Sequence, residues 1–437
     1  MSKWIRKSVE GILFVALFGL VMAVIQSPTY AAQTDIELWV VDTQFAPGEF
    51  DASRAWLEQW KDQFNASNPD IRLTAFPAAI SEETVAVRIA AGNPPDIVHI
   101  SSNVLSRWIA GDLLGGLLLP LDRYFERSRL RNAFIPDVID MARYGEHILG
   151  MPYALQIIFM TRNLDVYDRS GVAEPQTWEE HVGVTRRLTQ YGSEGQVLQW
   201  GHGWSVSAAA IVYWLDLGLR QLGYADGMIP QTAGQARIFH DDSIKTLSYL
   251  FDLWSLGPQL VSQGRSGNNF IAGRTAEVMG FANAVPQFQQ MLERGDNVVF
   301  RRLPGPGPDT DGVWINPWVY SILSSTKHPD EAWRVLEDLT SAQANKDYLM
   351  TAHQVLPVHR AHLTDRDILS RPMTKELIEI LYTPMYNYGP KHILMTSWHT
   401  LTGQPLLQAL NKEMGMETAL EVAQETLNTR LRQLMGE

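Results

Sequence analysis

The sequence predicts an α/β protein that is too large for one ordinary domain. In the first half of the chain, segments typical of β-strands alternate with segments typical of amphipathic helices, which indicates a mainly parallel sheet covered by helices. Without an amino-terminal export segment, roughly 400 residues remain, which is more than a single hydrophobic core usually holds. We therefore expect two domains. The chain contains no cysteine, and a core of this size can be stable without disulfides.

The first 32 residues are typical of a secretory signal peptide. Lys3, Arg6 and Lys7 precede an apolar run at 12–25, and small residues follow up to Ala32. A basic start, a short apolar run and small residues at the end define such a signal. The run is shorter than the ~20 residues of a membrane-spanning helix, and no later segment is long and apolar enough to span. We expect cleavage near Ala31 and a soluble, exported protein; an uncleaved membrane anchor is the alternative.

Charge and composition narrow the choice of partners and compartment. The chain has 36 basic and 48 acidic residues, of which the signal segment holds three and one, so the mature chain has 33 and 47, a net charge of -14. Such a surface disfavours nucleic acid and anionic lipid as partners. Without cysteine the amino terminus cannot be lipidated on that residue, which favours a periplasm between two membranes. The 14 tryptophans are well above average usage and call for a role.

The first elements follow a clear order. Strands are predicted at 36–41, 71–76 and 97–100. Between the first two strands lies a helix on which Trp56, Trp60 and Phe64 recur every four residues. They share one face, and we expect them to fill the core beneath the sheet.

A second helix is expected to end at Gly92, where a helix end favours positive φ, because Asn93-Pro94-Pro95 prevents its continuation. The strand that follows runs into the polar loop at 101–103, at its carboxyl end. In open α/β sheets such loops border the ligand crevice.

Further motifs along the chain resemble one protein family when taken in order. They occupy residues 88–98, 108–114, 119–125, 146–153, 160–167, 175–180, 270–280, 302–307 and 328–341. Together they resemble the extracellular solute-binding proteins of ATP-driven importers, in the carbohydrate-binding group that includes maltose-binding protein. Leu149 departs from the family pattern by replacing an aromatic residue, and Met160-Thr161 departs from it before Arg162. Thr177 and Glu180 also form a capping box, so that motif has a purely structural explanation.

The resemblance implies a two-lobed periplasmic-binding-protein fold of type II. Each lobe would be a mainly parallel sheet flanked by helices, and a hinge would join them. Carried onto this sequence, lobe one holds 33–154 plus 299–326, and lobe two holds 155–298 plus 327–437, with 1–32 removed as the signal peptide. The crossings near Ala154-Leu155 and 298–300 would form the hinge. The Gly/Pro-rich run at 304–312 is expected to be one surface loop.

Polar candidates for a sugar site lie at strand ends or beside the first crossing. A sugar needs aromatic planes for its C–H faces and fixed polar groups for its hydroxyls. The polar set is Asp42, Gln44, Ser102, Asn103, Tyr153 and Gln156. By resemblance, Asn103 and Gln156 fall where maltose-binding protein has sugar-contacting acids. An amide both donates and accepts, so sugar binding would survive, but the sugar need not be the same. Ordinary turn or loop roles are the alternative.

The remaining candidates are chiefly aromatic. The set is Trp200, Trp204, Phe281, Asn283, Trp314, Trp318 and Trp398. The first two are predicted in a glycine-loosened loop at 200–205, and Trp314 and Trp318 flank the turn signal Asn316-Pro317. By resemblance, the residues after Gly280 and the region of Trp398 supply stacking platforms. For each tryptophan a core position is the alternative. Residues 318, 320 and 322 alternate with their neighbours as in a strand, so part of this set is expected to be strand core.

The resemblance implies a monomeric periplasmic receptor that closes on a sugar and delivers it to importer permease subunits, with a separate ATPase. It implies no cofactor and no enzymatic activity. An exported carbohydrate-active enzyme is the alternative, although 47 acids supply no recognisable pair and the chain lacks a Gly-x-Ser-x-Gly elbow and a phosphate loop. His359 and His362 could share a metal on a helix, but Pro357 favours a loop or helix start. A sensory receptor would share the fold. Sugars, polyols, glycerol phosphodiesters and osmolyte glycosides all stay open as ligands.

Overall fold

The computed structural model describes most of the chain after the predicted signal segment. The described residues are 33–40, 49–76, 80, 82–101, 117–144, 146–203, 208–224, 227–228, 235–257, 265–281, 285–352, 356–371, 373–382 and 395–435. The signal segment and six predicted ligand residues lie outside them: Asp42, Gln44, Ser102, Asn103, Trp204 and Asn283. Gln156, Phe281 and Trp398 enter through their backbone only. Among the described helices, none combines the length and apolarity of a membrane span.

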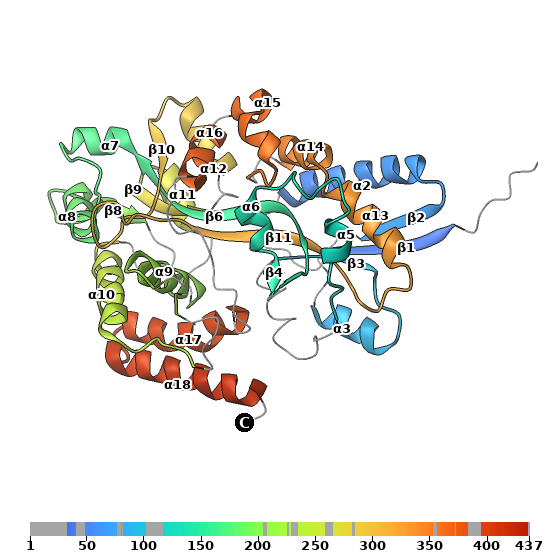
Figure 1. The fold of residues 1–437 in the computed structure, drawn as a ribbon. Helices are drawn as coiled ribbons and strands as arrows, with labels where there is room; N and C mark the ends of the chain where they lie inside the picture. The colour runs from blue at the N-terminus through green and yellow to red at the C-terminus, as the bar shows by residue number, and fades with distance from the viewer. Residues whose placement is uncertain are drawn as a thin grey trace, which may run out of the picture.

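One nine-stranded sheet runs through the molecule (Figure 1), in the order β2-β1-β3-β11-β6-β9-β8-β7, with β10 also paired to β6. Its strands are β1 (Thr34–Val40), β2 (Ile71–Phe76), β3 (Ile97–Ser101), β6 (Met151–Asn163), β7 (Gln190–Tyr191), β8 (Val197–Gly203), β9 (Thr275–Phe281), β10 (Val298–Arg301) and β11 (Trp314–Ile322). A two-stranded sheet pairs β4 (Arg143–Tyr144) with β5 (His147–Ile148). The predicted α/β class is confirmed.

Parallel pairs occupy the two outer parts of the large sheet. β1 pairs in parallel with β2 and β3, and β8 pairs in parallel with β9. The long central strands β6 and β11 are antiparallel to each other and to their other neighbours. Two mainly parallel regions are thus joined through a pair of long antiparallel strands.

The first half builds its core as the sequence predicts. Helices α2 (Glu49–Ser67) and α3 (Glu82–Ala90) separate the first three strands. Trp56, Trp60 and Phe64 are buried on α2, in one cluster with side chains of β1 and β2. Gly92 follows α3 with φ of 73°, the left-handed conformation expected at a helix end.

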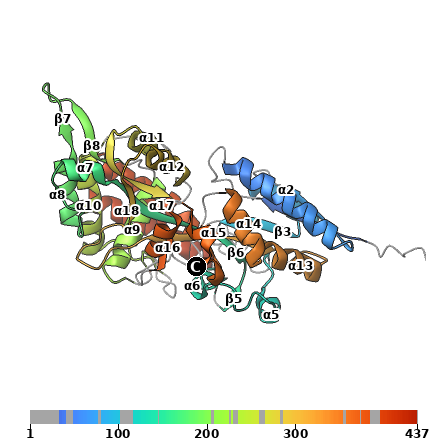
Figure 2. The same ribbon diagram turned by 90° about the horizontal axis from the view of Figure 1, so that it is seen from above.

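Helices α13 (Pro329–Leu339) and α14 (Ala342–Ala352) pack on α2 (Figure 2). The Trp60 indole donates to Asp338 of α13 at 3.0 Å, and the rings of Trp56 and Tyr348 of α14 are 4.8 Å apart. The sequence assigned residues from 327 onward to the second lobe. These contacts place 329–352 with first-lobe elements. The residue boundaries of the two lobes stay a prediction.

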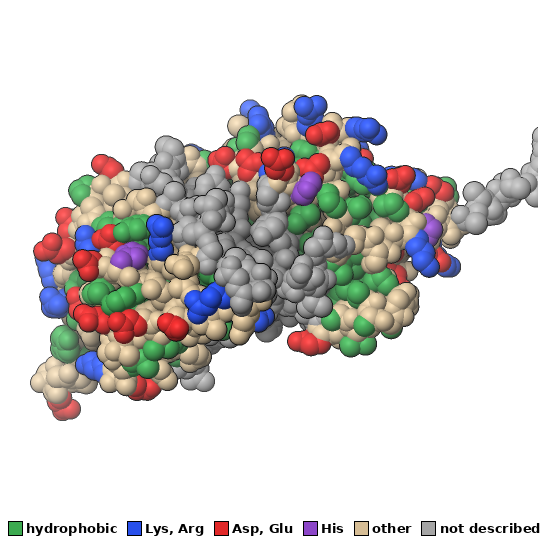
Figure 3. Space-filling model, turned by 60° about the horizontal axis from the view of Figure 1, so that its bottom comes forward, with side chains coloured by type: hydrophobic (Ala, Val, Ile, Leu, Met, Phe, Trp, Pro, Cys, Tyr) green, Lys and Arg blue, Asp and Glu red, His purple; other side chains and the backbone are tan. Residues whose placement is uncertain are grey.

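The second half contains a further core cluster and also contributes side chains to the first one. Its helices are α7 (Leu164–Arg169), α8 (Trp178–Leu188), α9 (Ala208–Gln221), α10 (Asp241–Ser255), α11 (Arg265–Ile271), α12 (Val285–Glu293), α16 (Thr374–Tyr382), α17 (Met395–Leu410) and α18 (Met416–Met435). Shorter helices are α5 (Asp122–Phe125), α6 (Pro136–Asp140), η2 (Arg360–Thr364) and α15 (Arg366–Leu369). Helix α9 carries Ile211, Trp214 and Leu215 into a cluster shared with α10, α17 and α18. On the face in Figure 3, basic and acidic side chains are interspersed over both halves.

Two local predictions are confirmed at the start of α8. Thr177 accepts from the backbone of Glu180 at 3.2 Å, and the Glu180 carboxylate accepts from the backbone of Thr177, which completes the capping box. The loop at 304–312 is closed at its base by backbone hydrogen bonds between Leu303 and Gly312, at 2.8 and 3.0 Å. Its exposed tip and buried base fit a surface loop that is fixed against α8.

Candidate functional site

The sheet register gathers several predicted ligand residues around the middle of β6. Trp314 on β11 and Phe281 at the end of β9 both lie opposite Ile158, one on each side of β6. Gln156 of β6 lies opposite Asn316. Segments about 125 to 160 positions apart in the sequence therefore meet in one zone of the sheet, which periodicity alone could not indicate.

The end of β3 reaches the same zone. Ser101, its last residue, lies opposite Trp318 of β11, and Trp318 lies opposite Ala154 of β6. The next residues along the chain are Ser102 and Asn103, which the sequence predicts to contact ligand. Four strands thus bring predicted site positions together at the level of the predicted first crossing.

Tyr153 is the extra residue of a β-bulge. Trp318 pairs with Ala154, but its neighbour Val319 pairs with Pro152, so Tyr153 has no opposite residue on β11. A bulge bends its strand and changes the direction of a side chain, and bulges are common beside functional sites. This bulge directly precedes the predicted crossing at Ala154-Leu155.

Tyr153 and Trp318 surround a buried histidine. The Tyr153 hydroxyl forms a hydrogen bond with His99 Nε2, and the Trp318 ring stacks on the His99 ring at 5.4 Å. Burial lowers the pKa of His99 to about 3, so this histidine is neutral. Tyr153 and Trp318 are each 3% exposed, which is the core position that the sequence left as the alternative. Their contact with a ligand stays a prediction.

Trp314 and Trp200, two further members of the predicted ligand set, occupy different environments. Trp314 is buried in the second core and packs against Tyr213, with ring centroids 4.5 Å apart. Trp200 is half-buried, and its backbone donates to Arg274 at 2.8 Å. The roles of both residues in binding stay predictions.

The predicted glycine-loosened loop at 200–205 is wrong up to Gly203, because Trp200 to Gly203 belong to β8. A Cβ on Gly201 would overlap the backbone carbonyl of Thr185, and one on Gly203 would lie 2.9 Å from the Thr275 side chain. Both glycines therefore allow close packing of β8 against α8 and β9. Their role is close packing, and the predicted loosening of a loop is not what they provide.

His359 and His362, the alternative metal pair, have ring centroids 5.4 Å apart. His359 Nε2 lies 2.9 Å from the carbonyl oxygen of Thr340, and both histidines flank or belong to the short helix η2. Among the described residues, one group of three metal-ligand side chains has its ligand atoms close together: His181, His202 and Glu277.

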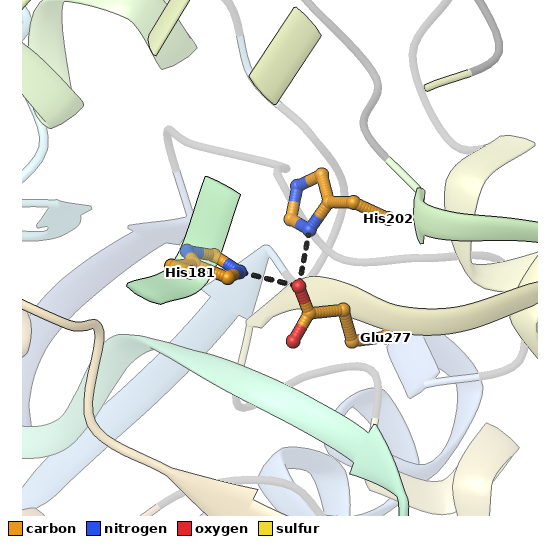
Figure 4. A group of neighbouring side chains, drawn as sticks. All are labelled: His181, His202 and Glu277. Carbon is orange, nitrogen blue, oxygen red and sulfur yellow. Dashed lines mark hydrogen bonds and ion pairs between the residues drawn. The ribbon is translucent and has the colours of Figure 1, made fainter. Parts of the chain in front are cut away.

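Glu277 is the centre of a buried polar cluster that the sequence analysis missed (Figure 4). Its Oε1 accepts from His181 Nε2, from His202 Nδ1 at 3.1 Å and from Thr185 Oγ1 at 3.3 Å. Its Oε2 accepts from the Arg162 guanidinium at 3.2 Å and from the Tyr167 hydroxyl at 2.6 Å. The sequence held one signal for this cluster: an acidic residue between Ala276 and Val278 in a predicted buried strand must find partners inside the protein.

The cluster is fully enclosed, and its electrostatics follow from that. Burial alone would raise the pKa of Glu277, but His181, His202 and Arg162 outweigh burial and hold this pKa well below its usual range. Burial lowers the pKa of His181. Glu277 is therefore an ionised carboxylate at neutral pH, and we take His181 as neutral.

The chain belongs to the bacterial extracellular solute-binding protein family, whose model matches residues 48–346. Its fold is similar to that of the sugar-binding protein MalE from Xanthomonas citri, with a TM-score of 0.75 and 15% identity over 92% of this chain and 98% of that one. It is also similar to the ABC substrate-binding protein Lmo0181 from Listeria monocytogenes in complex with cycloalternan, with a TM-score of 0.71 and 16% identity over 92% and 99%.

A third similar structure is the cyclic alpha-maltosyl-1,6-maltose binding protein from Arthrobacter globiformis, with a TM-score of 0.72 and 16% identity over 92% of this chain and 100% of that one. At these identities the comparisons show the shared fold. The predicted family and the two-lobed periplasmic-binding fold class are confirmed.

Proposed function

We propose that this protein is the substrate-binding component of an ABC importer and that it captures a sugar or a sugar-like solute. Family membership supports a receptor role. The observation that carries the sugar assignment is the register around β6, where predicted polar and aromatic positions from β3, β6, β9 and β11 meet. Structures of the same fold that are described with cycloalternan and with cyclic alpha-maltosyl-1,6-maltose support a carbohydrate ligand.

The proposed mechanism is hinge closure. A solute that contacts both lobes stabilises a closed form, so its binding shifts an open–closed equilibrium. The strands β6 and β11 run through the middle of the sheet, and a few residues near the bulge at Tyr153 could absorb the change in backbone angles. The closed form would dock on two permease subunits, and ATP would be consumed by a separate partner. The receptor would act as a monomer in the periplasm after removal of its signal peptide.

The proposal is tested with the mature chain from Gln33 onward and a panel of unmodified solutes. The panel contains maltose, maltotriose, cycloalternan, mannobiose, D-tagatose, sugar alcohols and glycerol phosphates. A solute that binds the native state at 100 times its Kd stabilises it by about 2.7 kcal/mol, which a thermal-shift assay detects. We expect one carbohydrate to raise the melting temperature and to be recovered unchanged.

The other outcomes of this panel are informative. Release of product from a glycoside would support the enzyme alternative. A response to glycerol phosphates alone, or to nothing in the panel, would contradict the sugar assignment. Affinity in the micromolar range, roughly -8 kcal/mol, would be sufficient for a receptor.

A further inference from the structure

We propose that Glu277 is a positioning residue of the solute site, because it fixes the carboxyl end of β8 against β9 and against the layer beneath them. This inference rests on the proposed function, since it gives Glu277 a role in solute affinity. The carboxylate itself lies in the interior and is 0% exposed, so it would act through the strands.

The hydrogen bonds of Glu277 join five elements at one point. The donors come from β6, α7, α8 and β8, and the carboxylate comes from β9; the donor residues are Arg162, Tyr167, His181, Thr185 and His202. An ionised carboxylate has about four acceptor positions, so five donors saturate it. A neutral side chain of the same size cannot accept from both sides at once.

The cluster lies directly before the end of β8 and near the start of β9. His202 pairs with Glu277 in the parallel register of β8 and β9, and β8 ends one residue later at Gly203. The next residue is Trp204, which the sequence predicts to contact solute. On β9, Phe281 is four residues beyond Glu277 and lies in the zone around β6. The position of the end of β8 relative to β9 therefore depends on this carboxylate.

A chain of alternating charges holds the cluster in place. Arg162 contacts Glu277 and also donates to Glu174 at 3.0 Å. Arg301 of β10 binds both oxygens of Glu174, at 2.9 and 3.0 Å, and donates to Glu376 of α16 at 2.9 Å. Arg162, the counter-ion of Glu277, is thus held by Glu174 on the side away from Glu277. The negative charge of Glu277 is compensated within the protein.

A metal ion is the competing explanation for two histidines and a glutamate. Their ligand atoms all lie within 4.8 Å of one another. An ion would have to displace the hydrogens that His181 and His202 direct at Oε1, and it would stand beside the Arg162 guanidinium. Hydrogen bonding already uses both oxygens of Glu277, so we assign the cluster to positioning and treat a bound metal as an outcome of the test.

The geometry implies opposite tautomers for the two histidines. His181 directs Nε2 at Glu277, and its Nδ1 lies 2.7 Å from the Tyr249 hydroxyl, which can donate to it. His202 directs Nδ1 at the same carboxylate oxygen. His181 should therefore carry its proton on Nε2, and His202 should carry its proton on Nδ1.

The first measurement uses the mature protein labelled with ¹⁵N-histidine, at pH 7 and without solute. We expect imidazole spectra to show a proton on Nε2 of His181 and on Nδ1 of His202, the two nitrogens that contact Glu277. The same tautomer on both, or one equivalent of zinc bound by protein purified without added metal, would overturn the hydrogen-bond assignment.

The second measurement is hydrogen exchange of wild type and Glu277→Gln. The NH₂ group of the new glutamine would face one of the donors that the carboxylate now accepts from, which loosens the contact between β8 and β9. Exchange should therefore increase at least tenfold in peptides covering 197–203 and 275–281 and remain unchanged in β1 and β2. The control is His359→Gln, which alters a buried histidine that stacks on Phe134, away from the Glu277 cluster. Wild-type exchange in Glu277→Gln would overturn the proposal, as would an equal increase throughout the chain.

The third measurement is affinity, with maltotriose or whichever sugar of the panel wild type binds most tightly. Glu277→Gln should bind at least tenfold more weakly at a temperature where it is folded, and His359→Gln should stay within twofold; unchanged affinity in Glu277→Gln would overturn the role in binding. If Glu277→Gln does not fold, the test uses two variants of His202. His202→Asn retains a donor near Nδ1 and should keep the affinity for sugar, whereas His202→Leu should lose it; equal affinity of these two variants would overturn the role in binding.

If wild type binds no sugar, the proposed function fails while the spectra and exchange still decide the role of Glu277.

Discussion

At the residue scale, histidines buried in a neutral form should make the protein sensitive to acid. Burial lowers the pKa of His99 to about 3 and that of His359 to about 4, compared with 6.5 for an exposed histidine. Above pH 6.5 both the native and the unfolded chain are neutral at these positions. Below it the unfolded chain takes up protons that the native chain does not, so stability falls as the pH falls.

We expect the free energy of unfolding to decrease between pH 6.5 and 5 by about 2 kcal/mol for each such histidine. His359→Gln should flatten this dependence, because the amide can replace Nε2 as donor to Thr340 but does not titrate. Urea denaturation from pH 5 to 8 measures the effect in both proteins. Equal slopes for the variant and wild type would mean that His359 is not buried as a neutral group.

Glu277 also stabilises the native state less as the pH falls, but here the charged form is the one that stabilises. Its pKa is held well below the usual range, so its contribution is present above pH 4.5 and is lost as the pH falls toward the lowered value. The losses from the histidines therefore begin at a higher pH than the loss from Glu277.

At the element scale, two glycines on adjacent elements should respond oppositely to alanine. Gly201 of β8 has no room, since an added Cβ would overlap the carbonyl of Thr185 on α8. Gly183 of the same helix has no neighbouring atom within 4 Å of an added Cβ. Gly201→Ala should destabilise by about 1–3 kcal/mol, and Gly183→Ala should stabilise by about 0.5–1 kcal/mol. Equilibrium unfolding of both variants tests this, and a tolerated Gly201→Ala would show that β8 is not packed against α8.

The same elements show what the sequence could and could not indicate. The face of Trp56, Trp60 and Phe64 and the end of a helix at Gly92 follow from local periodicity and backbone preference, and both were predicted. Strand β8 was missed because a glycine used for close packing looks identical in sequence to one that loosens a loop. The Glu277 cluster was missed because its partners come from four other elements, and no spacing in the chain relates them.

At the scale of the whole molecule, the position of the sheet strands explains why the lobe boundary was misplaced for 329–352. The chain returns to the first-half strands through β11, which pairs with β3. Helices α13 and α14 follow β11 and pack there, because Trp56 and Trp60 of α2 contact Tyr348 and Asp338. The register zone around β6 likewise depends on strand pairing between distant segments. Such pairings are properties of the fold, and the family resemblance supplied the expectation of a two-lobed arrangement.

The last prediction concerns the motion of the whole molecule. The strands β6 and β11 join the two halves with an irregular register at Tyr153, and α9, α10, α17 and α18 form a core cluster apart from that of β1 and β2. If a solute binds both halves, saturating amounts of a sugar that raises the melting temperature should decrease the radius of gyration in small-angle X-ray scattering. A sugar of the panel that does not change the melting temperature is the control and should leave the scattering unchanged. An unchanged radius with bound sugar would contradict hinge closure, while the proposed binding role would remain, because a solute with equal affinity for both states shifts no equilibrium.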